Sequence, residues 1–381
     1  MSEMSYLEKL LDGVEVEWLP LGHIAAIKTG QSVNKNMISK NPGVYPVINS
    51  GREPLGFINT WNTDNDPIGI TTRGAGVGSV IWQEGKYFRG NLNYSITIDK
   101  KNHINIRYMY HALLHMKNDI HELCTFDGIP ALNAGSLKKL LIPIPCPDNP
   151  EKSLAIQSEI VRILDKFTVL TAELTAELNM RKKQYNYYRD QLLSFKEGEV
   201  EWKTLGEVAV IGTGNHDTQD AIEHGKYIFY ARGREPLKLN VFDFDETAII
   251  TAGDGAGVGK VFHYAKGKYA LHQRAYRIVP NAFMNPRFVY HYITAYFFTY
   301  IQKASVSSSV TSLRRPMFLK FPIPVPPSEE QARIVEILDK FDTLTNSITE
   351  GLPREIELRQ KQYEYYRDLL FSFPKPETVS N

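Results

Sequence analysis

Apolar residues recur at alternating spacings of four and three in two stretches of the chain, and each stretch predicts a long amphipathic helix. The apolar positions are Ile156, Ile160, Ile163, Phe167, Leu170 and Leu174 in the first stretch, and Ile334, Ile337, Phe341, Leu344 and Ile348 in the second. A stripe this narrow needs a partner helix, so we expect the two stretches to pair as a coiled coil. The first should run as one helix over 151–195, whereas Gly351-Leu352-Pro353 should break or kink the second.

A different pattern precedes each helix. Short β-branched runs, such as PIGITT at 67–72 and TAIIT at 247–251, alternate with stretches rich in Gly, Asn and Thr, which predicts short strands joined by turns. A Pro-rich tract then ends each region, at 141–150 and at 320–330. Because these tracts lack amide donors and lead into a helix start, they predict domain boundaries in a mixed α/β (α+β) fold.

The chain repeats itself with a period of about 180 residues. Residues 14–30 and 198–214 are identical at ten of 17 positions, and the motifs GREPL, GAGVG and GKY follow in the same order in both copies. QSEIVRILDKF at 157–167 matches QARIVEILDKF at eight of 11 positions. The N-terminal SYLEKLLDGVEVEW resembles 187–202, so the chain begins inside a repeat, and we expect its head and tail to meet in a closed, pseudo-two-fold arrangement.

Charge is distributed unevenly along the repeats. The formal net charge is only +1, but residues 14–150 hold 13 Lys and Arg against 11 Asp and Glu, a net +2, and residues 198–326 hold 15 against 11, a net +4. The remaining pieces, 1–13, 151–197 and 327–381, carry −2, +1 and −4. Basic globular regions attached to a neutral or acidic helical region favour contact between the globular regions and phosphate.

Several classes of protein are disfavoured by the sequence. No apolar run approaches the 18 residues of a membrane span, and the N-terminus lacks the basic region of a secretory signal. The two cysteines, Cys124 and Cys146, form neither a disulfide framework nor a zinc motif, which favours a reducing cytoplasm. The chain has no P-loop lysine, no Asn-Pro-Pro-Tyr tetrapeptide and no acid-acid-lysine nuclease cluster, so we expect it to catalyse nothing.

The glycine motif and the tyrosine-rich motif each allow more than one interpretation. GAGVG is followed by predicted strands, which favours a hairpin turn over a loop that approaches a phosphate backbone and, least of all, over a nucleotide site. In QYNYYRD and QYEYYRD, tyrosines three residues apart share one helix face. Packing against a partner helix or subunit is therefore favoured over stacking on bases.

These motifs together resemble a known family. Two variable globular halves, each closed by a PIP-P tract and followed by EIVRILDKF (159–167) or RIVEILDKF (333–341), are similar to the specificity (S) subunit of type I restriction-modification enzymes. TAELTAELNMRKKQYNYYRDQLLSF at 171–195 and EVEWKTLGE at 199–207 resemble the IC class of that family. The resemblance covers essentially the whole chain.

The resemblance implies an architecture. Two target-recognition domains form a tandem pseudo-repeat, separated by two long antiparallel coiled-coil helices. On this basis residues 1–13 are an N-terminal stub that completes the cyclic repeat, 14–150 are target-recognition domain 1, 151–197 the central long helix, 198–326 target-recognition domain 2, and 327–381 a C-terminal helical region that pairs with the central helix.

It also implies a function and partners. The chain would be the non-catalytic DNA sequence-specificity subunit of a bacterial, cytoplasmic restriction endonuclease/adenine methyltransferase complex. Each globular domain would bind one half of a bipartite asymmetric target in double-stranded DNA. The helices would dock two methyltransferase (M) subunits and, through them, two restriction (R) subunits. This chain would bind no cofactor or metal itself; S-adenosylmethionine would belong to the methyltransferase partner, and ATP and Mg to the restriction partner.

Comparing the two copies separates scaffold residues from candidate base-contacting residues. If the half-sites differ, base contacts should differ between repeats, and Arg suits guanine whereas Asn or Gln suits adenine. The polar residues that differ beside shared landmarks are the candidates, with exposed surface as the alternative for each. In the first copy they are Gln31, Asn34, Arg73, Arg89, Asn91, Asn93 and Asn133; in the second they are Asn215, His216, Arg232, His272, Gln273, Arg274, Arg314 and Arg315.

Two alternatives remain open from the sequence: a protein-interaction scaffold, and the DNA-binding module of a solitary modification enzyme. Salt-dependent binding to duplex DNA in the presence of a methyltransferase partner separates them. The repeat TAELTAEL at 171–178 adds a further expectation, since one four-residue unit lengthens a helix by about 6 Å. We expect this segment to set the length of the unread spacer between the half-sites.

Overall fold

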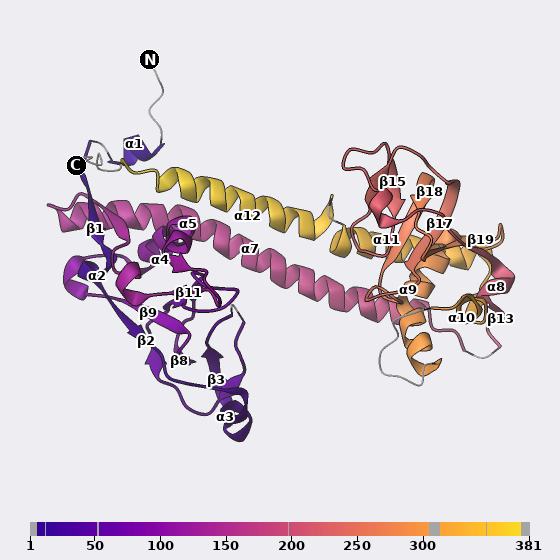
Figure 1. The fold of residues 1–381 in the computed structure, drawn as a ribbon, viewed down its shortest axis with the longest axis horizontal. Helices are drawn as coiled ribbons and strands as arrows, with labels where there is room; N and C mark the ends of the chain where they lie inside the picture. The colour runs from indigo at the N-terminus through magenta and orange to yellow at the C-terminus, as the bar shows by residue number, and fades with distance from the viewer. Residues whose placement is uncertain are drawn as a thin grey trace, which may run out of the picture. The chain divides into compact units, whose positions relative to one another are not determined.

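The structure is a computed structural model that describes residues 6–11, 13–51, 53–196, 198–304, 313–347 and 349–374. It divides into two compact units (Figure 1). Unit 1 comprises Met1–Leu174 with Ile356–Asn381, and unit 2 comprises Thr175–Glu355. Both are mixed α/β, as the sequence predicts. In the described part of the chain, no helix is long and apolar enough to span a membrane.

Unit 1 contains two small sheets. The first has the order β2 (Ala25–Thr29), β9 (Asn93–Ile98), β6 (Ile68–Thr71) and β7 (Val80–Trp82). The second has the order β4 (Phe57–Ile58), β3 (Pro42–Ile48), β8 (Lys86–Arg89) and β5 (Thr63–Asp64). Two further pairs are β1 (Val16–Pro20) with β12 (Leu141–Pro145), and β10 (Cys124–Thr125) with β11 (Ala131–Leu132). The helices of this part are α1 (Tyr6–Leu11), α2 (Leu21–Ile24), α3 (Lys35–Lys40), α4 (Ile106–His115), α5 (Lys117–Glu122) and α6 (Ala134–Leu137).

In unit 2 the equivalent strands form one larger sheet. Its order is β14 (Ala209–Thr213), β19 (Ala275–Pro280), β17 (Phe244–Ala252), β18 (Phe262–Leu271), β15 (Tyr227–Tyr230) and β16 (Leu237–Leu239). Strand β13 (Glu201–Thr204) pairs with β20 (Pro322–Val325), as β1 pairs with β12 in unit 1. The helices are α8 (Leu205–Val208), α9 (Pro286–Ala304) and α10 (Arg315–Leu319). The Pro-rich tracts are therefore edge strands, where missing amide donors are tolerated.

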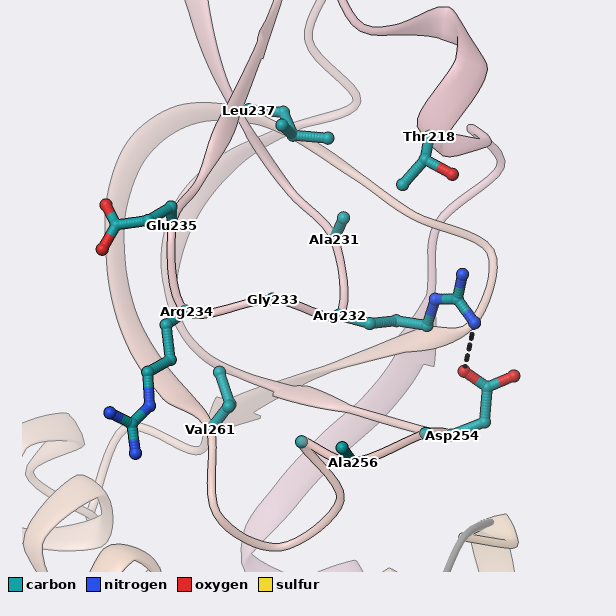
Figure 2. Close-up of a pocket in the computed structure, with 12 residues that line it drawn as sticks. Thr218, Ala231, Arg232, Gly233, Arg234, Glu235, Leu237, Asp254, Ala256 and Val261 are labelled. Carbon is teal, nitrogen blue, oxygen red and sulfur yellow. Dashed lines mark hydrogen bonds and ion pairs between the residues drawn. The ribbon is translucent and has the colours of Figure 1, made fainter. Parts of the chain in front are cut away.

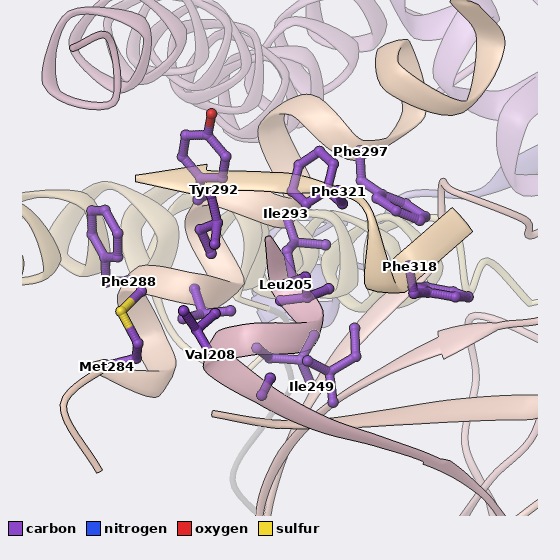
Figure 3. Packing of buried hydrophobic residues seen from close by; sticks show 14 of the residues in the cluster. Leu205, Val208, Ile249, Met284, Phe288, Tyr292, Ile293, Phe297, Phe318 and Phe321 are labelled. Carbon is purple, nitrogen blue, oxygen red and sulfur yellow. The ribbon is translucent and has the colours of Figure 1, made fainter. Parts of the chain in front are cut away.

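The core of unit 2 lies between α9 and the sheet. Figure 3 shows Leu205 and Val208 of α8, Ile249 of β17 and the aromatic rings of α9 and α10 packed together. Phe288, Phe297, Phe318 and Phe321 are all buried. Burial of aromatic side chains on this scale supplies a large part of the unit's stability.

The predicted long helices are present. α7 (Pro150–Leu192) is one uninterrupted helix of 43 residues. The second stretch is divided into α11 (Ser328–Asn346) and α12 (Gly351–Leu370), which confirms the predicted break. Gly351 has a φ of +77°, and a Cβ there would lie 2.4 Å from the carbonyl oxygen of Thr343. Only glycine fits this turn.

Each unit pairs one half of α7 antiparallel to one C-terminal helix. In unit 1, Phe167 of α7 stacks on Tyr366 of α12 with ring centroids 5.3 Å apart, and Ile160 packs with Leu370. In unit 2, Tyr188 of α7 stacks on Phe341 of α11 at 5.6 Å. Packing of the tyrosine motif against a partner helix is thereby confirmed for Tyr188 and Tyr366.

The predicted helix seam is only partly correct. Ile160 and Ile334 are fully buried, and Ile163, Phe167, Leu174, Ile337, Phe341 and Leu344 are half-buried. Leu170 is exposed, and Ile348 lies outside the described residues. Leu164 and Leu338, which the heptad assignment omitted, are fully buried. The N-terminal half of α7 and the helix α11 each bury their main apolar face against the globular domain of the same unit. The buried positions therefore follow an i, i+4 stripe and not the heptad pattern.

A polar junction fixes each globular domain to its helix. In unit 1, Arg107 of α4 donates to Asp165 of α7, and His111 Nε2 lies 2.8 Å from Asp165 Oδ1. In unit 2, Arg287 donates to Asp339 of α11, and His291 Nε2 lies 2.7 Å from Asp339 Oδ1. Amide groups add to the junction, because Gln157 accepts from Asn105 N and Gln331 accepts from Asn285 N. The ILDKF motif recurs because it supplies both this carboxylate and the stacking phenylalanine.

The two ends of the described chain meet in unit 1. The indole Nε1 of Trp18 donates to the carbonyl oxygen of Pro374 at 2.8 Å. Leu7 and Leu11 of α1 pack against Leu370 and Phe371. This contact is the one that the cyclic repeat predicts.

Candidate nucleic-acid interface

Backbone hydrogen bonds tie four loops of unit 1 into one surface. The amide of Gln31, after β2, donates to the carbonyl oxygen of Arg89 at 2.9 Å. Thr72, before the GAGVG turn, donates to Leu92 at 3.0 Å and accepts from the amide of Leu132 at 2.8 Å. The loops after β2, after β6, after β8 and before α6 are therefore neighbours. These are the loops on which the sequence places most candidate base-contacting residues.

Unit 2 repeats these three contacts, with the first made one residue further along the chain. His216 N donates to Leu271 O at 3.3 Å, Gly253 N donates to Arg274 O at 2.8 Å, and Leu313 N donates to Gly253 O at 2.7 Å. In both units a shared tyrosine lies over the last of these loops, because Tyr94 Oη donates to Leu132 O and Tyr276 Oη donates to Leu313 O, each at 3.4 Å. The shared residues thus build a common scaffold, and the differing side chains project from it.

The Thr-Gly pair shared by the two copies lets the loop after β2, and the loop after β14, pass close to the backbone at the end of a neighbouring strand. A Cβ on Gly30 would lie 2.3 Å from the carbonyl oxygen of Gly90, and one on Gly214 would lie 1.8 Å from that of Leu271. No side chain is tolerated at such distances. Beyond each glycine the chain forms a bridge, Gln31 with Gly90 and His216 with His272.

A carboxylate joins two arginines in the surface of unit 2. Asp254 accepts from Arg232 Nη1 at 2.9 Å and from Arg274 Nη1 at 3.1 Å. Burial opposes ionisation of Asp254, but the hydrogen bonds from both arginines outweigh it and lower the pKa of this carboxyl below its ordinary value. The group is therefore an anion that holds two guanidinium groups in place, each with donors left over.

Two further carboxylates order the same surface. His216 Nε2 lies 3.0 Å from Asp243 Oδ1, and Gln273 Nε2 donates to Asp217 at 2.9 Å. Arg274 N donates to His272 Nδ1, and burial lowers the pKa of His272, which favours its neutral form. His216, Arg232, Gln273 and Arg274, which are candidates from three separate segments of the sequence, lie in one network.

This network borders a pocket of about 550 Å³. Its lining includes Arg232, Arg234 and Glu235 from the GREPL region and Asp254 from the segment before the GAGVG turn (Figure 2). Arg232 points toward Asp254, whereas Arg234 points away from it. The GAGVG segment itself forms turns, with Val77 N donating to Gly74 O and Val258 N donating to Gly255 O, so the hairpin interpretation is confirmed.

The remaining candidates are placed as follows. Gln31, Arg73, Asn91, Asn215, Arg314 and Arg315 are exposed on these loops. Asn34 and Asn133 are also exposed, but their side-chain oxygens accept from Met37 N and Gly135 N as helix N-caps. Their amide NH₂ groups are the part that remains for a ligand.

Three candidates are buried, and the sequence-based prediction for them is corrected. Arg89, Asn93 and His272 are 3 %, 0 % and 1 % exposed. Arg89 donates to the carbonyl oxygens of Asp66 and Tyr94 and to the side chain of Asn93. These groups support the loops from inside, because a side chain buried in the protein interior does not reach a base.

Sequence comparison missed the residues that organise the loops. Asn62 accepts from the amide of Arg89 at 2.7 Å, and Asp243 accepts from the amide of Leu271 at 2.8 Å, which is the equivalent position. Asp217, which accepts from Gln273, also escaped selection as a site residue. The signal was present for Asn62 and Asp243, since both follow an aromatic residue at the same distance before the buried strand.

The geometry defines a class of protein: two domains with one scaffold and different polar side chains at the same loops, each carried on a helical pair. The chain belongs to the type I restriction modification DNA specificity domain family, whose profile matches residues 13–181 and 197–358. It is a DNA specificity subunit of a type I restriction-modification system, a non-catalytic subunit with two target-recognition domains.

Similar proteins support the same assignment. The chain is 45% identical over 417 aligned positions to the type I restriction enzyme EcoR124I/EcoR124II specificity subunit of Escherichia coli, with all of both chains covered. It is 36% identical to the EcoprrI specificity subunit of Escherichia coli, over 92% of this chain and 93% of that one. The fold matches the crystal structure of the type I restriction-modification S subunit from M. genitalium with a TM-score of 0.68 at 19% identity, over 98% of this chain and 100% of that one.

Proposed function

We propose that each unit recognises one half of a bipartite, asymmetric DNA target. The observation that carries this proposal is the pair of equivalent loop arrangements, on which the polar side chains differ. Residues 14–150 and 198–326 are the two target-recognition domains in this proposal, residues 1–13 complete the cyclic repeat, and 151–197 and 327–381 supply the helices. A split target needs two recognition surfaces of common design and different chemistry, and duplication followed by divergence provides them.

The base contacts are proposed to come from the exposed and half-buried members of the loops. In domain 1 these are Gln31, Asn34, Arg73, Asn91 and Asn133, and in domain 2 they are Asn215, His216, Arg232, Gln273, Arg274, Arg314 and Arg315. Arg232 and Arg274, both bonded to Asp254, are directed as a unit and suit guanine O6 and N7. The amides in domain 1 suit adenine N6 and N7. The half-site of domain 2 is therefore expected to contain guanine.

The helices are proposed to set the spacing of the half-sites and to dock the partners. Two methyltransferase subunits would bind, with two restriction subunits attached through them. S-adenosylmethionine would be held by the methyltransferase partner, and ATP and Mg by the restriction partner. Within the described residues no group of three or more His, Cys, Asp and Glu side chains is arranged to hold a metal ion.

A domain exchange tests the proposal. The assembled complex is expressed in cells with residues 198–326 replaced by the corresponding domain of a relative, and the methylated sequences are mapped by single-molecule sequencing. One half of the target should change while the other half is retained. If both halves change together, or neither does, the modular assignment is wrong.

A further inference from the structure

A lysine of the shared GKY motif lies over an exposed aromatic ring in both units. Lys86 Nζ is 4.6 Å from the ring centroid of Trp61, and Lys268 Nζ is 4.7 Å from that of Phe242. Both rings are substantially exposed, 43% for Trp61 and 40% for Phe242, and both lysines are exposed. The aromatic residue differs between the copies, but the lysine and its placement are retained.

The two positions are structurally equivalent. The residue after Trp61 is Asn62, which binds the backbone of Arg89, and the residue after Phe242 is Asp243, which binds the backbone of Leu271. Register in the strands agrees, because Asp64 faces Lys86 and Asp245 faces Lys268. The match therefore rests on hydrogen bonds and strand pairing as well as on sequence.

Folding explains the other two residues of the motif but not the lysine. Gly85 and Gly267 have φ angles of +68° and +86°, which a turn requires. Tyr87 and Tyr269 are buried, and their hydroxyls donate to Asp66 O and Glu246 Oε1. Among the described residues, each lysine ammonium contacts its aromatic ring, and no side-chain hydrogen bond or ion pair is found for it, either with the aspartate that it faces on the neighbouring strand or with another residue.

A side chain that diverged domains share without a structural need points to a ligand that both domains share. On the proposed function, the two half-sites differ in base sequence but have the same sugar-phosphate backbone. We propose that Lys86 and Lys268 each contact a DNA phosphate, with the aromatic ring fixing the direction of the ammonium group. The inference rests on the proposed function and adds a phosphate site to each domain.

The location supports this role. Asn62 follows the ring of Trp61 and accepts from the amide of Arg89, after which the loop with Asn91 begins. Asp243 follows the ring of Phe242 and accepts from the amide of Leu271, after which the loop with Gln273 and Arg274 begins. A phosphate held there lies next to the proposed base contacts. Because Asp64 and Asp245 partly offset the lysine charge, we expect about one phosphate contact per domain and no general affinity for anions.

Salt-dependent binding by the complete complex tests the proposal. Lys86→Ala, Lys268→Ala and the double variant are assembled with the methyltransferase partner, and the affinity for duplex DNA is measured across salt concentrations. Each lysine removed should reduce the slope of log K against log salt by about 0.9, on target and on non-target duplex alike. The methylated sequence should stay the same, and Lys→Arg at each position should restore the slope.

Matched controls separate this site from general charge. Lys101→Ala in unit 1 removes an exposed lysine that is paired with Asp99, and Lys340→Ala removes one on α11 that is paired with Glu336. Neither should change the slope. An unchanged slope in the double Lys86/Lys268 variant overturns the inference, and so does lost binding of the methyltransferase partner with an unchanged DNA slope. If the unmodified complex shows no preference for any DNA sequence, the proposed function itself fails.

Discussion

His111 Nε2 lies 2.8 Å from Asp165 Oδ1, and this contact joins the first target-recognition domain to the central helix. The imidazole is fully buried, and its Nδ1 lies 2.8 Å from the hydroxyl of Tyr363 on α12. A single histidine side chain therefore touches the domain core, the central helix and the C-terminal helix. His291 and Asp339 repeat the contact in unit 2.

Asp165→Asn should weaken unit 1 by about 2 kcal/mol, because it removes the negative charge that binds Arg107 and replaces one of the two carboxylate oxygens shared by Arg107 and His111 with an amide NH₂ group. Three of the four tryptophans, Trp18, Trp61 and Trp82, lie in unit 1, so chemical unfolding followed by tryptophan fluorescence reports this unit. Arg162→Ala, which breaks an exposed pair with Glu159 on the same helix, is the control and should have a much smaller effect. Equal midpoints for Asp165→Asn and the parent would contradict a stabilising junction.

The same histidine predicts a pH dependence. Burial lowers the pKa of His111 to about 4, against an ordinary value of 6.5, despite the opposing hydrogen bond to Asp165. The unfolded chain therefore binds the proton that the folded unit excludes, so the contribution of His111 to stability is constant well above pH 6.5 and falls as the pH is lowered from 6.5 toward 4. The limiting slope is about 1.4 kcal/mol per pH unit.

His111→Gln removes this titration, so the stability difference between the parent and the variant should narrow as the pH falls through that window. Unfolding midpoints from pH 7.5 to pH 4.5 provide the comparison. A difference that stays constant over the window would show that His111 does not titrate as its burial requires.

Gly214→Ala should disrupt unit 2, since the new Cβ would lie 1.8 Å from the carbonyl oxygen of Leu271 and backbone must move to admit it. We expect a loss of about 2 kcal/mol or more and a selective loss of recognition of one half-site. Gly233→Ala is the matched control in the same unit, because its Cβ would have no heavy atom closer than 3.8 Å. Normal recognition by Gly214→Ala would mean that the loop crossing is not needed.

Arg274→Ala should relax recognition of one base pair in the half-site of domain 2. A bidentate arginine contact with guanine contributes about 1–3 kcal/mol of discrimination, which corresponds to roughly a 5- to 150-fold loss of preference at that position. Asp254→Asn should act in the same direction, because it leaves Arg232 and Arg274 without their common anchor. Methylation mapping in cells gives the readout, with Arg333→Ala on α11 as a control that should leave the target unchanged.

The repeat made much of this architecture predictable. Two copies of one sequence predicted two similar domains, the Pro-rich tracts predicted their ends, and Gly351-Leu352-Pro353 predicted the break after α11. Which side of each helix is buried was not predictable from a heptad pattern alone. Leu164 and Leu338 are buried by the globular domains, and that contact depends on the position of α4 and α9 in three dimensions.

The candidate site was predictable at the level of loops but not of individual side chains. Comparison of the copies selected loops that the structure places next to one another, because shared landmarks mark equivalent turns. It could not distinguish Arg274, which is exposed, from Arg89, which folds back onto carbonyl oxygens in the interior. Direction of a side chain at a strand end depends on local twist and on neighbours from distant sequence positions.

The central helix supplies the last prediction. α7 is continuous through TAELTAEL at 171–178, and the division between the two units falls inside this repeat, between Leu174 and Thr175. Insertion of one TAEL unit after Leu178 lengthens the helical connection by about 6 Å and turns it about 40° beyond a full turn, so the apolar stripe is nearly retained.

Six ångströms correspond to at most about two base pairs of DNA, at 3.4 Å for each. The variant should therefore modify targets whose unread spacer is one or two base pairs longer, with both half-sites unchanged. Removal of one unit should shorten the spacer by the same amount. Ala176→Gln, which changes the exposed surface of the repeat without changing its length, is the control and should keep the original spacing. A lengthened variant that still modifies the original spacing and no other would show that this segment is only an exposed part of a long helix.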